Sequence, residues 1–201
     1  MIKRGFDIFF AVAGLILFSP LMVLAALLVK YGSQGPVLFK QERIGRGFRP
    51  FLIYKFRTMR QSLDKEGRLI TIGEDLRITP VGRLLRKTKI DELPQLLNVL
   101  KGDMSFVGPR PEVRQYVEAF QKDYEEILKV RPGITDLASL KYRDEAMLLG
   151  KAVNPEEEYL TRILPDKIKL ARDYLQHASL LFDIRLIIKT LFKLFDYRTS
   201  S

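Results

Sequence analysis

The chain has 201 residues, 47% of them apolar, which fits one domain with a sizeable core. It has no cysteine and only one histidine, His177, so disulfide frameworks, thiolate chemistry and multi-histidine metal sites are excluded. The net charge is +10, of which residues 1–60 alone carry +8. Such a basic region suits an anionic membrane surface, a phosphate-rich substrate or nucleic acid.

The first predicted element is a membrane segment. Residues 8–29 form a run of 22 residues without a charge, long enough for a helix to cross the hydrocarbon core of a bilayer. A signal peptide fits poorly, because the run is too long and no small-x-small cleavage site follows it. Pro20 removes an amide donor and clashes with the preceding turn, so Ser19-Pro20 predicts a kink or a break in this helix. Ser19 can satisfy a freed backbone group locally.

The charges that flank this run bear on its topology. Basic residues precede it and follow it, and positive charge favours the cytoplasmic side of a membrane. The pattern therefore favours a re-entrant helix that enters and leaves by the same face, while a kinked spanning helix stays open. Asp7 follows Lys3 and Arg4 by one turn, and we expect it to pair with them.

A β-hairpin is predicted next, because VLFKQERI and FLIYKFRTM flank Gly45–Gly47. Lys55 and Arg57 fall on one face of the second strand. That face is either an ordinary solvated surface or a cationic edge directed at phosphate.

The rest of the chain is predominantly helical in pattern, so the sequence predicts an α+β, mainly helical fold. Residues 61–79 are polar and predict a loop. Helices are predicted over residues 81–89, 91–100, 112–130, 135–153, 155–176 and 180–197, with Gly102 as a C-cap. In the last helix, apolar residues follow helical spacing and Arg185, Lys189 and Lys193 lie elsewhere on the wheel. Both a core-packed helix and an amphipathic helix at a membrane interface fit that pattern.

Asp91 and Glu92 are adjacent carboxylates in front of a proline and an apolar run. An acidic pair there is typical of a helix start. Successive helix residues do not face each other, so the pair suits a nucleophile beside a metal ligand or base better than an opposed glycosidase pair. Arg86, Lys87 and Lys89 precede it, and cations and helix N-termini attract phosphate. We expect these cations to hold Asp91 ionised and therefore nucleophilic.

Arg110 lies between Pro109 and Pro111. Proline restricts the backbone, so this guanidinium is presented with little freedom to lose on binding. A stiff linker or a peptide-ligand motif is the alternative. Taken together, these features predict a phosphate site at a membrane surface.

The sequence resembles the bacterial sugar transferase family, the monotopic polyprenyl-phosphate phosphoglycosyl transferases, in the small form of that family. The matches, in chain order, are KRGFD (3–7), Ser19-Pro20, FLIYKFRTM (51–59), Arg86 with KIDELPQLLNVLKGDMSFVGPRPE (89–112), and RPGIT (131–135). The pattern DELPQLxNVLxGxMSxVGPRP is a long and specific signature.

The resemblance implies a reaction and a set of roles. A UDP-sugar gives its sugar-1-phosphate to a polyprenyl phosphate, usually undecaprenyl phosphate, and UMP leaves. Asp91 is implied as the nucleophile that forms a covalent phosphosugar intermediate, and Glu92 as a ligand of Mg²⁺. Lys55, Arg86 and Arg110 match basic substrate-binding positions.

The resemblance also implies a location. Residues 1–30 form a re-entrant membrane segment broken at Ser19-Pro20, and residues 31–201 form a catalytic domain continuous with it, with amphipathic helices at the interface. The expected site is the cytoplasmic face of the bacterial inner membrane, in contact with its lipid, at the first membrane step of a glycoconjugate pathway. A homodimer is one candidate assembly, and no nucleic acid is expected. The rival hypothesis is a non-catalytic, membrane-anchored module that binds anionic lipid or nucleic acid.

This sequence departs from the family pattern after RPGIT. Where members often continue with Gly-Trp/Leu-x-Gln-Val, this chain has Asp136-Leu137-Ala138-Ser139-Leu140. Members also often carry an aspartate three residues before a late tyrosine, but the residue three before Tyr174 is Ala171. The preference for sugar and nucleotide is the property most exposed to these changes.

Overall fold

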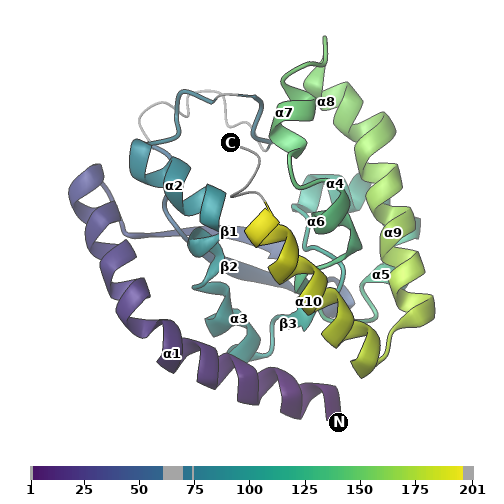
Figure 1. Ribbon diagram of the computed structural model, residues 1–201. Coiled ribbons are helices and arrows are strands. Elements are labelled where there is room, and N and C mark those ends of the chain that lie inside the picture. The colour runs from purple at the N-terminus through teal and green to yellow at the C-terminus, as the bar shows by residue number, and fades with distance from the viewer. Residues whose placement is uncertain (1, 61–69, 74, 197–201) are drawn as a thin grey trace.

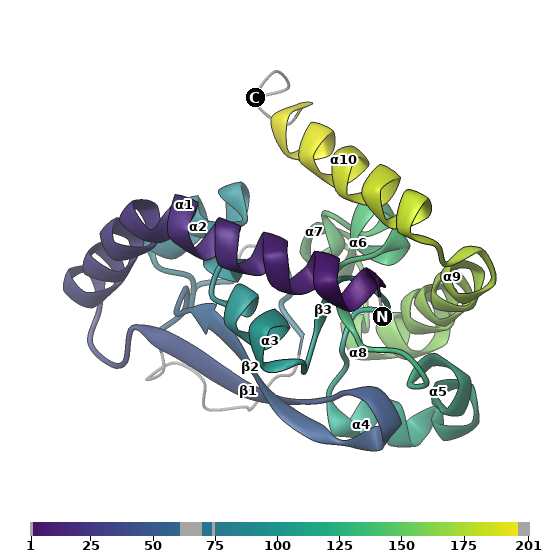
Figure 2. The same ribbon diagram turned by 90° about the horizontal axis from the view of Figure 1, so that it is seen from below.

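The computed structural model describes residues 2–60, 70–73 and 75–196, so residues 61–69 and 74 of the loop predicted over residues 61–79 lie outside the described part. The fold is mainly helical and contains a two-stranded antiparallel hairpin, as predicted. A long N-terminal helix, α1 (Ile2–Gly32), lies along one side of the molecule and α9 (Leu164–His177) lies on the opposite side (Figure 1). The strands and the shorter helices α2 (Pro80–Thr88) and α3 (Gln95–Lys101) lie between them (Figures 1 and 2).

Helix α1, Ile2–Gly32, is long and apolar enough to cross a membrane. It stays helical through Pro20 and is bent near its middle (Figure 1). Pro20 has no amide to donate to the carbonyl of Ile16, and the hydroxyl of Ser19 donates to that carbonyl instead, at 2.8 Å. The break predicted at Ser19-Pro20 thus takes the form of a bend, and the freed carbonyl is satisfied locally.

The first turns of α1 are tied to the body of the protein. The Asp7 carboxylate is 2% exposed and accepts hydrogen bonds from Ser105 Oγ at 3.0 Å and from the Phe106 amide at 3.1 Å. Arg4 donates to the carbonyls of Val99 and Leu100, at 2.6 and 3.0 Å. The prediction that Asp7 pairs with Lys3 and Arg4 was therefore wrong, because the buried backbone that faces these side chains provides partners from distant parts of the chain.

The predicted hairpin is confirmed. Strands β1, Leu38–Ile44, and β2, Pro50–Phe56, pair antiparallel around a 3-10 turn, η1, over Arg46–Phe48. A second, unpredicted sheet is formed by the short parallel strands β3, Ser105–Val107, and β4, Gly133–Thr135. A Cβ atom on Gly133 would lie 2.1 Å from the amide nitrogen of Gly108, so the close approach of these two segments requires glycine.

The helix predicted over residues 91–100 is in fact two elements. A single 3-10 turn, η3, covers Ile90–Glu92, and helix α3 begins only at Gln95 and ends at Lys101. Pro94 cannot donate the backbone hydrogen bond that would join them. The acidic pair therefore does not cap α3. The preceding helix α2, Pro80–Thr88, and the C-cap at Gly102 are as predicted.

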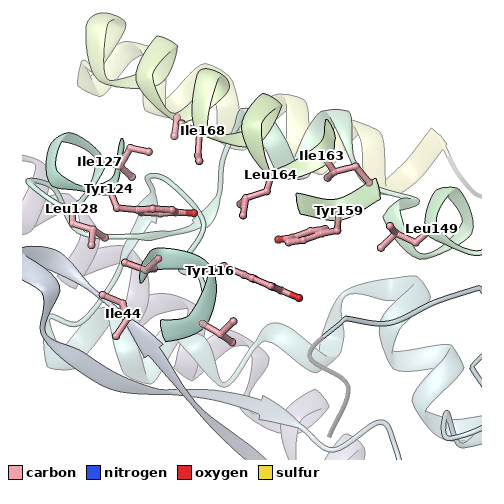
Figure 3. Close-up of a cluster of buried hydrophobic side chains, with 13 residues drawn as sticks. Ile44, Tyr116, Tyr124, Ile127, Leu128, Leu149, Tyr159, Ile163, Leu164 and Ile168 are labelled. Atoms are coloured by element: carbon pink, nitrogen blue, oxygen red, sulfur yellow. The ribbon is translucent and has the colours of Figure 1, made fainter. Parts of the chain in front are cut away.

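The C-terminal half is broken into short helices more often than the sequence predicts. They are α4 (Arg114–Ala119), α5 (Gln121–Ile127), α6 (Leu137–Lys141), α7 (Glu145–Leu149), α8 (Pro155–Glu158), the π-helical turn η4 (Tyr159–Ile163), α9 (Leu164–His177) and α10 (Leu180–Asp196). Apolar side chains of α4, α5, α7, η4 and α9 meet in a buried cluster around Tyr116, Tyr159 and Leu164, which also receives Ile44 from the hairpin (Figure 3).

Helix α10 has one apolar side chain buried against the protein and others exposed, so both predictions for it stay open. Leu186 is buried, whereas Leu181, Ile188 and Phe192 are exposed. Its first turns lie near the N-terminal end of α1 (Figures 1 and 2), where Asp183 pairs with Lys3.

Candidate active site

Asp91 and Glu92 lie on η3, between α2 and α3. Lys89, which ends α2, has φ of 57°, a left-handed conformation that is uncommon for a residue with a side chain. This conformation lets the chain end α2 and begin a new turn within three residues. The Asp91 residue is 7% exposed, so the acidic pair is withdrawn from water.

The carboxylate of Glu92 is held by two cations. Lys55 Nζ lies 2.7 Å and Arg110 Nη2 lies 2.8 Å from the same oxygen, Oε1. Burial alone would raise the pKa of Glu92, but the positive charges of Lys55 and Arg110 outweigh it and hold this pKa well below its usual range. Glu92 in turn raises the pKa of Arg110, so this pair remains charged.

Asp91 has a different environment. Its Oδ1 atom is buried and has no hydrogen-bond partner among the described residues. Burial, reinforced by the adjacent charge of Glu92, raises the pKa of Asp91, while Lys55 and Lys89 act in the opposite direction. The expectation from the sequence counted the cations and missed the burial, so the direction of the pKa shift is opposite to the one expected. Because no hydrogen bond within the described part of the chain satisfies Oδ1, this oxygen remains available to a ligand.

Two further cations, Arg86 and Arg57, have different roles in the structure. Arg86 lies on α2 and donates from Nε to Thr58 Oγ1 at 2.8 Å, and its side chain lines the same cleft as Asp91 and Glu92. Arg57 is 3% exposed and donates to the carbonyls of Val29 and Ser33, so its guanidinium secures the end of α1. The cationic edge considered for the hairpin thus reaches the site through Lys55 rather than through Arg57.

Asp136 supports the site and was not identified from the sequence. Its Oδ2 atom accepts from the backbone amide of Arg110 at 3.1 Å, and its Oδ1 atom accepts from the amide of Ser139 at 2.7 Å. One carboxylate therefore caps α6 and fixes the backbone from which Arg110 reaches Glu92. An aspartate directly before an apolar helix start is a signal for the cap, but nothing local indicates the contact with Arg110.

The acidic pair opens into a cleft of about 1460 Å³. One end is apolar and includes Phe10, Leu17 and Phe18 of α1. Its polar wall is rich in lysine and arginine side chains, a composition that suits a ligand carrying several phosphate charges. The remaining wall comes from the C-terminal half of the chain and includes Tyr116 and Tyr159.

The described residues contain no group of three His, Cys, Asp or Glu side chains that could hold a metal ion. Mg²⁺ commonly binds through only one or two carboxylates, with water and substrate phosphate as the other ligands. The orphaned Oδ1 of Asp91 beside Glu92 fits such a shared site. The residues therefore fit a magnesium ion that arrives with a phosphorylated ligand.

Comparison with known proteins identifies the family. The family model described as bacterial sugar transferase matches residues 1–197 of this chain, so the chain belongs to the bacterial sugar transferase family.

Three relatives illustrate the similarity. The UDP-N-acetylgalactosamine-undecaprenyl-phosphate N-acetylgalactosaminephosphotransferase of Aeromonas hydrophila is 43% identical over 94% of this chain, which spans 43% of that relative. The UDP-glucose:undecaprenyl-phosphate glucose-1-phosphate transferase of Caulobacter vibrioides is 41% identical over 94% of this chain and 67% of its own length. The exopolysaccharide production protein PSS of Rhizobium leguminosarum is 38% identical, and the match covers 94% of this chain and 93% of the relative.

Proposed function

We propose that this protein transfers a sugar-1-phosphate from a UDP-sugar to a polyprenyl phosphate and releases UMP. The observation that carries the proposal is the contrast within the acidic pair. One oxygen of Glu92, Oε1, is paired with both Lys55 and Arg110, whereas Asp91 presents a buried oxygen without a hydrogen-bond partner among the described residues to a cationic cleft. The names of the Aeromonas and Caulobacter relatives support a UDP-sugar as donor and undecaprenyl phosphate as acceptor.

The transfer has two steps. In the first, Asp91 attacks the β-phosphorus of the donor, a bond forms between its carboxylate oxygen and that phosphorus, and the bond to the bridging oxygen breaks so that UMP leaves. In the second, an oxygen of the polyprenyl phosphate attacks the same phosphorus and the bond to Asp91 breaks. The product is a polyprenyl diphosphate sugar, and the carboxylate is regenerated.

The surrounding residues bind and orient the diphosphate. Arg110 and Lys55 keep Glu92 charged and place two cations beside the reacting phosphate, and Arg86 adds a third from α2. Asp91 and Glu92 are the residues that would hold Mg²⁺, which when bound supplies charge neutralisation for the diphosphate.

Helix α1 explains why the acceptor can be a membrane lipid. Its exposed apolar residues suit the hydrocarbon of a bilayer, and residues of its first half line one end of the cleft. We propose that α1 is re-entrant and holds the site at headgroup depth on the cytoplasmic face of the bacterial inner membrane. The product would then be the first lipid-linked intermediate of a glycoconjugate pathway.

The rival function is a non-catalytic module that uses the basic N-terminal region to bind anionic lipid or nucleic acid. It predicts salt-dependent binding and no UMP release from any donor. The acidic pair argues against it, because a buried carboxylate in a cationic cleft weakens anion binding unless chemistry needs it.

The test is a screen of UDP-sugars with undecaprenyl phosphate in lipid nanodiscs, read out as UMP release. We expect at least one donor to release many molecules of UMP per enzyme, and to do so only when both the lipid phosphate and Mg²⁺ are present. Asp91→Asn should abolish this release. Arg114→Gln, at an exposed cation of α4 outside the cleft, is the matched control and should retain it. Absence of UMP release from all donors would overturn the proposal.

A further inference from the structure

Tyr116 has an unexplained hydroxyl group. The residue lies on α4 and is 2% exposed, yet its OH atom has no hydrogen-bond partner among the described residues. Nearly all buried polar atoms in proteins are paired, and one left unpaired destabilises the fold. A phenylalanine at this position would fill the same space without that cost.

Two other buried tyrosines, Tyr159 and Tyr174, have hydroxyl groups with partners. The ring of Tyr159 packs against that of Tyr116 with centroids 4.9 Å apart, and its hydroxyl donates to Glu112 Oε1 at 2.9 Å. Tyr174 is equally buried and donates to Asp183 at 2.8 Å. Figure 3 shows the hydroxyls of Tyr124 and Tyr159 directed toward the middle of the apolar cluster, whereas the hydroxyl of Tyr116 points the other way.

The location of Tyr116 suggests why its hydroxyl is left without a partner in the described part of the chain. Its side chain lines the cleft that contains Asp91, together with Arg43, Val113 and Tyr159. Arg43 is the second residue here with a buried, unpartnered atom, Nε, although its two terminal nitrogens bond to the carbonyl of Pro111 at 3.1 Å and to a side-chain oxygen of Gln41 at 2.7 Å. Pro111 follows Arg110 directly, so this part of the cleft adjoins the cation that holds Glu92.

The chemistry of this wall fits one part of the substrate better than the others. Phosphate charges are matched by Lys55, Arg86 and Arg110, and the apolar end of the cleft along α1 suits the lipid. A neutral tyrosine hydroxyl and one guanidinium N–H suit an uncharged oxygen acceptor. The ring of Tyr159 and the side chain of Val113 supply an apolar surface for a ring beside it.

We propose that the Tyr116 hydroxyl and Arg43 Nε bind an uncharged oxygen of the nucleotide-sugar donor, either a sugar hydroxyl or carbonyl, or a uracil carbonyl. This inference rests on the proposed function. It makes Tyr116 a determinant of donor recognition at the same site as Asp91. The hydroxyl is retained at a cost to the fold because the ligand completes its hydrogen bonding.

The test compares Tyr116→Phe with Tyr124→Phe. Tyr124 is 4% exposed and does not line the cleft, so it is a matched buried tyrosine. We expect Tyr116→Phe to leave the thermal midpoint unchanged or higher and to lower kcat/KM for the UDP-sugar about tenfold, mainly through KM. Tyr124→Phe should leave kcat/KM at the wild-type value.

Inhibition by UMP separates the two sources of the oxygen. If the inhibition constant of UMP rises with KM in Tyr116→Phe, the contact is to uracil. If it is unchanged, the contact is to the sugar.

Two results would overturn the inference: a wild-type kcat/KM in Tyr116→Phe, or a loss of stability with KM unchanged, which would mean that the hydroxyl serves the fold. Calorimetric binding of UDP-glucose and UDP-N-acetylgalactosamine supplies a readout that does not need turnover. A wild-type protein that binds a donor without releasing UMP would overturn the proposed function alone, and weaker binding by Tyr116→Phe would still support the subsite. Equal binding by the two proteins would overturn the subsite.

Discussion

Asp91 and Glu112 have carboxylates that are almost equally buried but differ in their hydrogen-bond partners. Asp91 is 7% exposed and Glu112 is 6% exposed. Glu112 accepts from Tyr159 OH at 2.9 Å and pairs with Arg43 at 3.4 Å, so each of its oxygens has a partner. Asp91 Oδ1 has none among the described residues. At the same degree of burial, Glu112 is therefore part of a hydrogen-bonded network, whereas the unpaired oxygen of Asp91 destabilises the fold.

This difference helps to distinguish buried charged residues that stabilise the fold from those that serve a function. A satisfied buried carboxylate is explained by the groups around it. An unsatisfied one needs another explanation, and a cationic cleft at a helix junction supplies it for Asp91. The predictions below test whether this contrast holds.

The largest effect is expected for Asp91→Asn. The variant retains the shape of the side chain and removes the nucleophilic oxygen, so turnover should fall by a factor of about 10³ or more. Because the buried charge is removed as well, the free energy of unfolding should stay the same or rise by about 1 kcal/mol. Chemical denaturation beside the UMP assay measures both. A variant that lost stability along with turnover would mean that Asp91 is a structural residue.

Glu112→Gln should show the opposite pattern in stability. The amide keeps an oxygen for Tyr159 but places an NH₂ group against Arg43, so a buried cation loses its counter-charge. We expect the free energy of unfolding to fall by about 2 kcal/mol. Arg114→Gln, at an exposed ion pair, is the control and should change it by less than about 1 kcal/mol. If Glu112→Gln were as stable as the wild type, Glu112 would not stabilise the fold, and it would not differ from Asp91 in this respect.

A smaller effect is expected at Asp136. Serine in its place keeps a cap for α6 but is too short to reach the Arg110 amide as well, whereas alanine loses both contacts. Asp136→Ser should therefore lower kcat about tenfold with near-normal stability, and Asp136→Ala should lower both. In an Arg110→Gln background, Asp136→Ser should have little further effect on kcat. Additive losses in the double variant would show that Asp136 does not act through Arg110.

The smallest effect is a shift in pH dependence. Since burial raises the pKa of Asp91 above the ordinary 3.8, the nucleophile should become protonated, and kcat/KM should fall, at a higher pH than for an exposed aspartate. The pKa of Glu92 is lowered, so Glu92 stays charged through this range. Lys89→Gln removes an opposing cation and should move the acid limb of the profile upward by a few tenths of a pH unit. A shift downward, or the same shift in the exposed control Lys122→Gln, would assign the limb to another group.

Elements with a local signal could be predicted from the sequence. The hairpin follows from two β-rich runs around glycines, and the bend in α1 and its repair follow from Ser19-Pro20. Lys55, Asp91, Glu92 and Arg110 were expected at one site, and the structure does bring them together.

What the sequence could not provide are the partners supplied by distant segments. Asp7 binds the backbone of β3 rather than its neighbours on α1, and the guanidinium of Arg57 bonds to carbonyls at the end of α1 rather than to Glu92. The burial that raises the pKa of Asp91 is likewise a property of packing. Tyr174 donates to Asp183 of α10, a contact between two helices that no local pattern indicates. Tertiary contacts decided each case.

The central claim is that Asp91 becomes covalently attached to the phosphosugar. The most direct measurement is the intact mass of the protein after brief incubation with a UDP-sugar and Mg²⁺ in the absence of polyprenyl phosphate. We expect the wild-type mass to rise by one sugar-phosphate, the Asp91→Asn mass to remain unchanged, and peptide mapping to locate the adduct on residues 90–92. Addition of undecaprenyl phosphate should then restore the original mass. An adduct that persisted in Asp91→Asn, or a donor turned over by the wild type with no adduct at any time, would contradict the account.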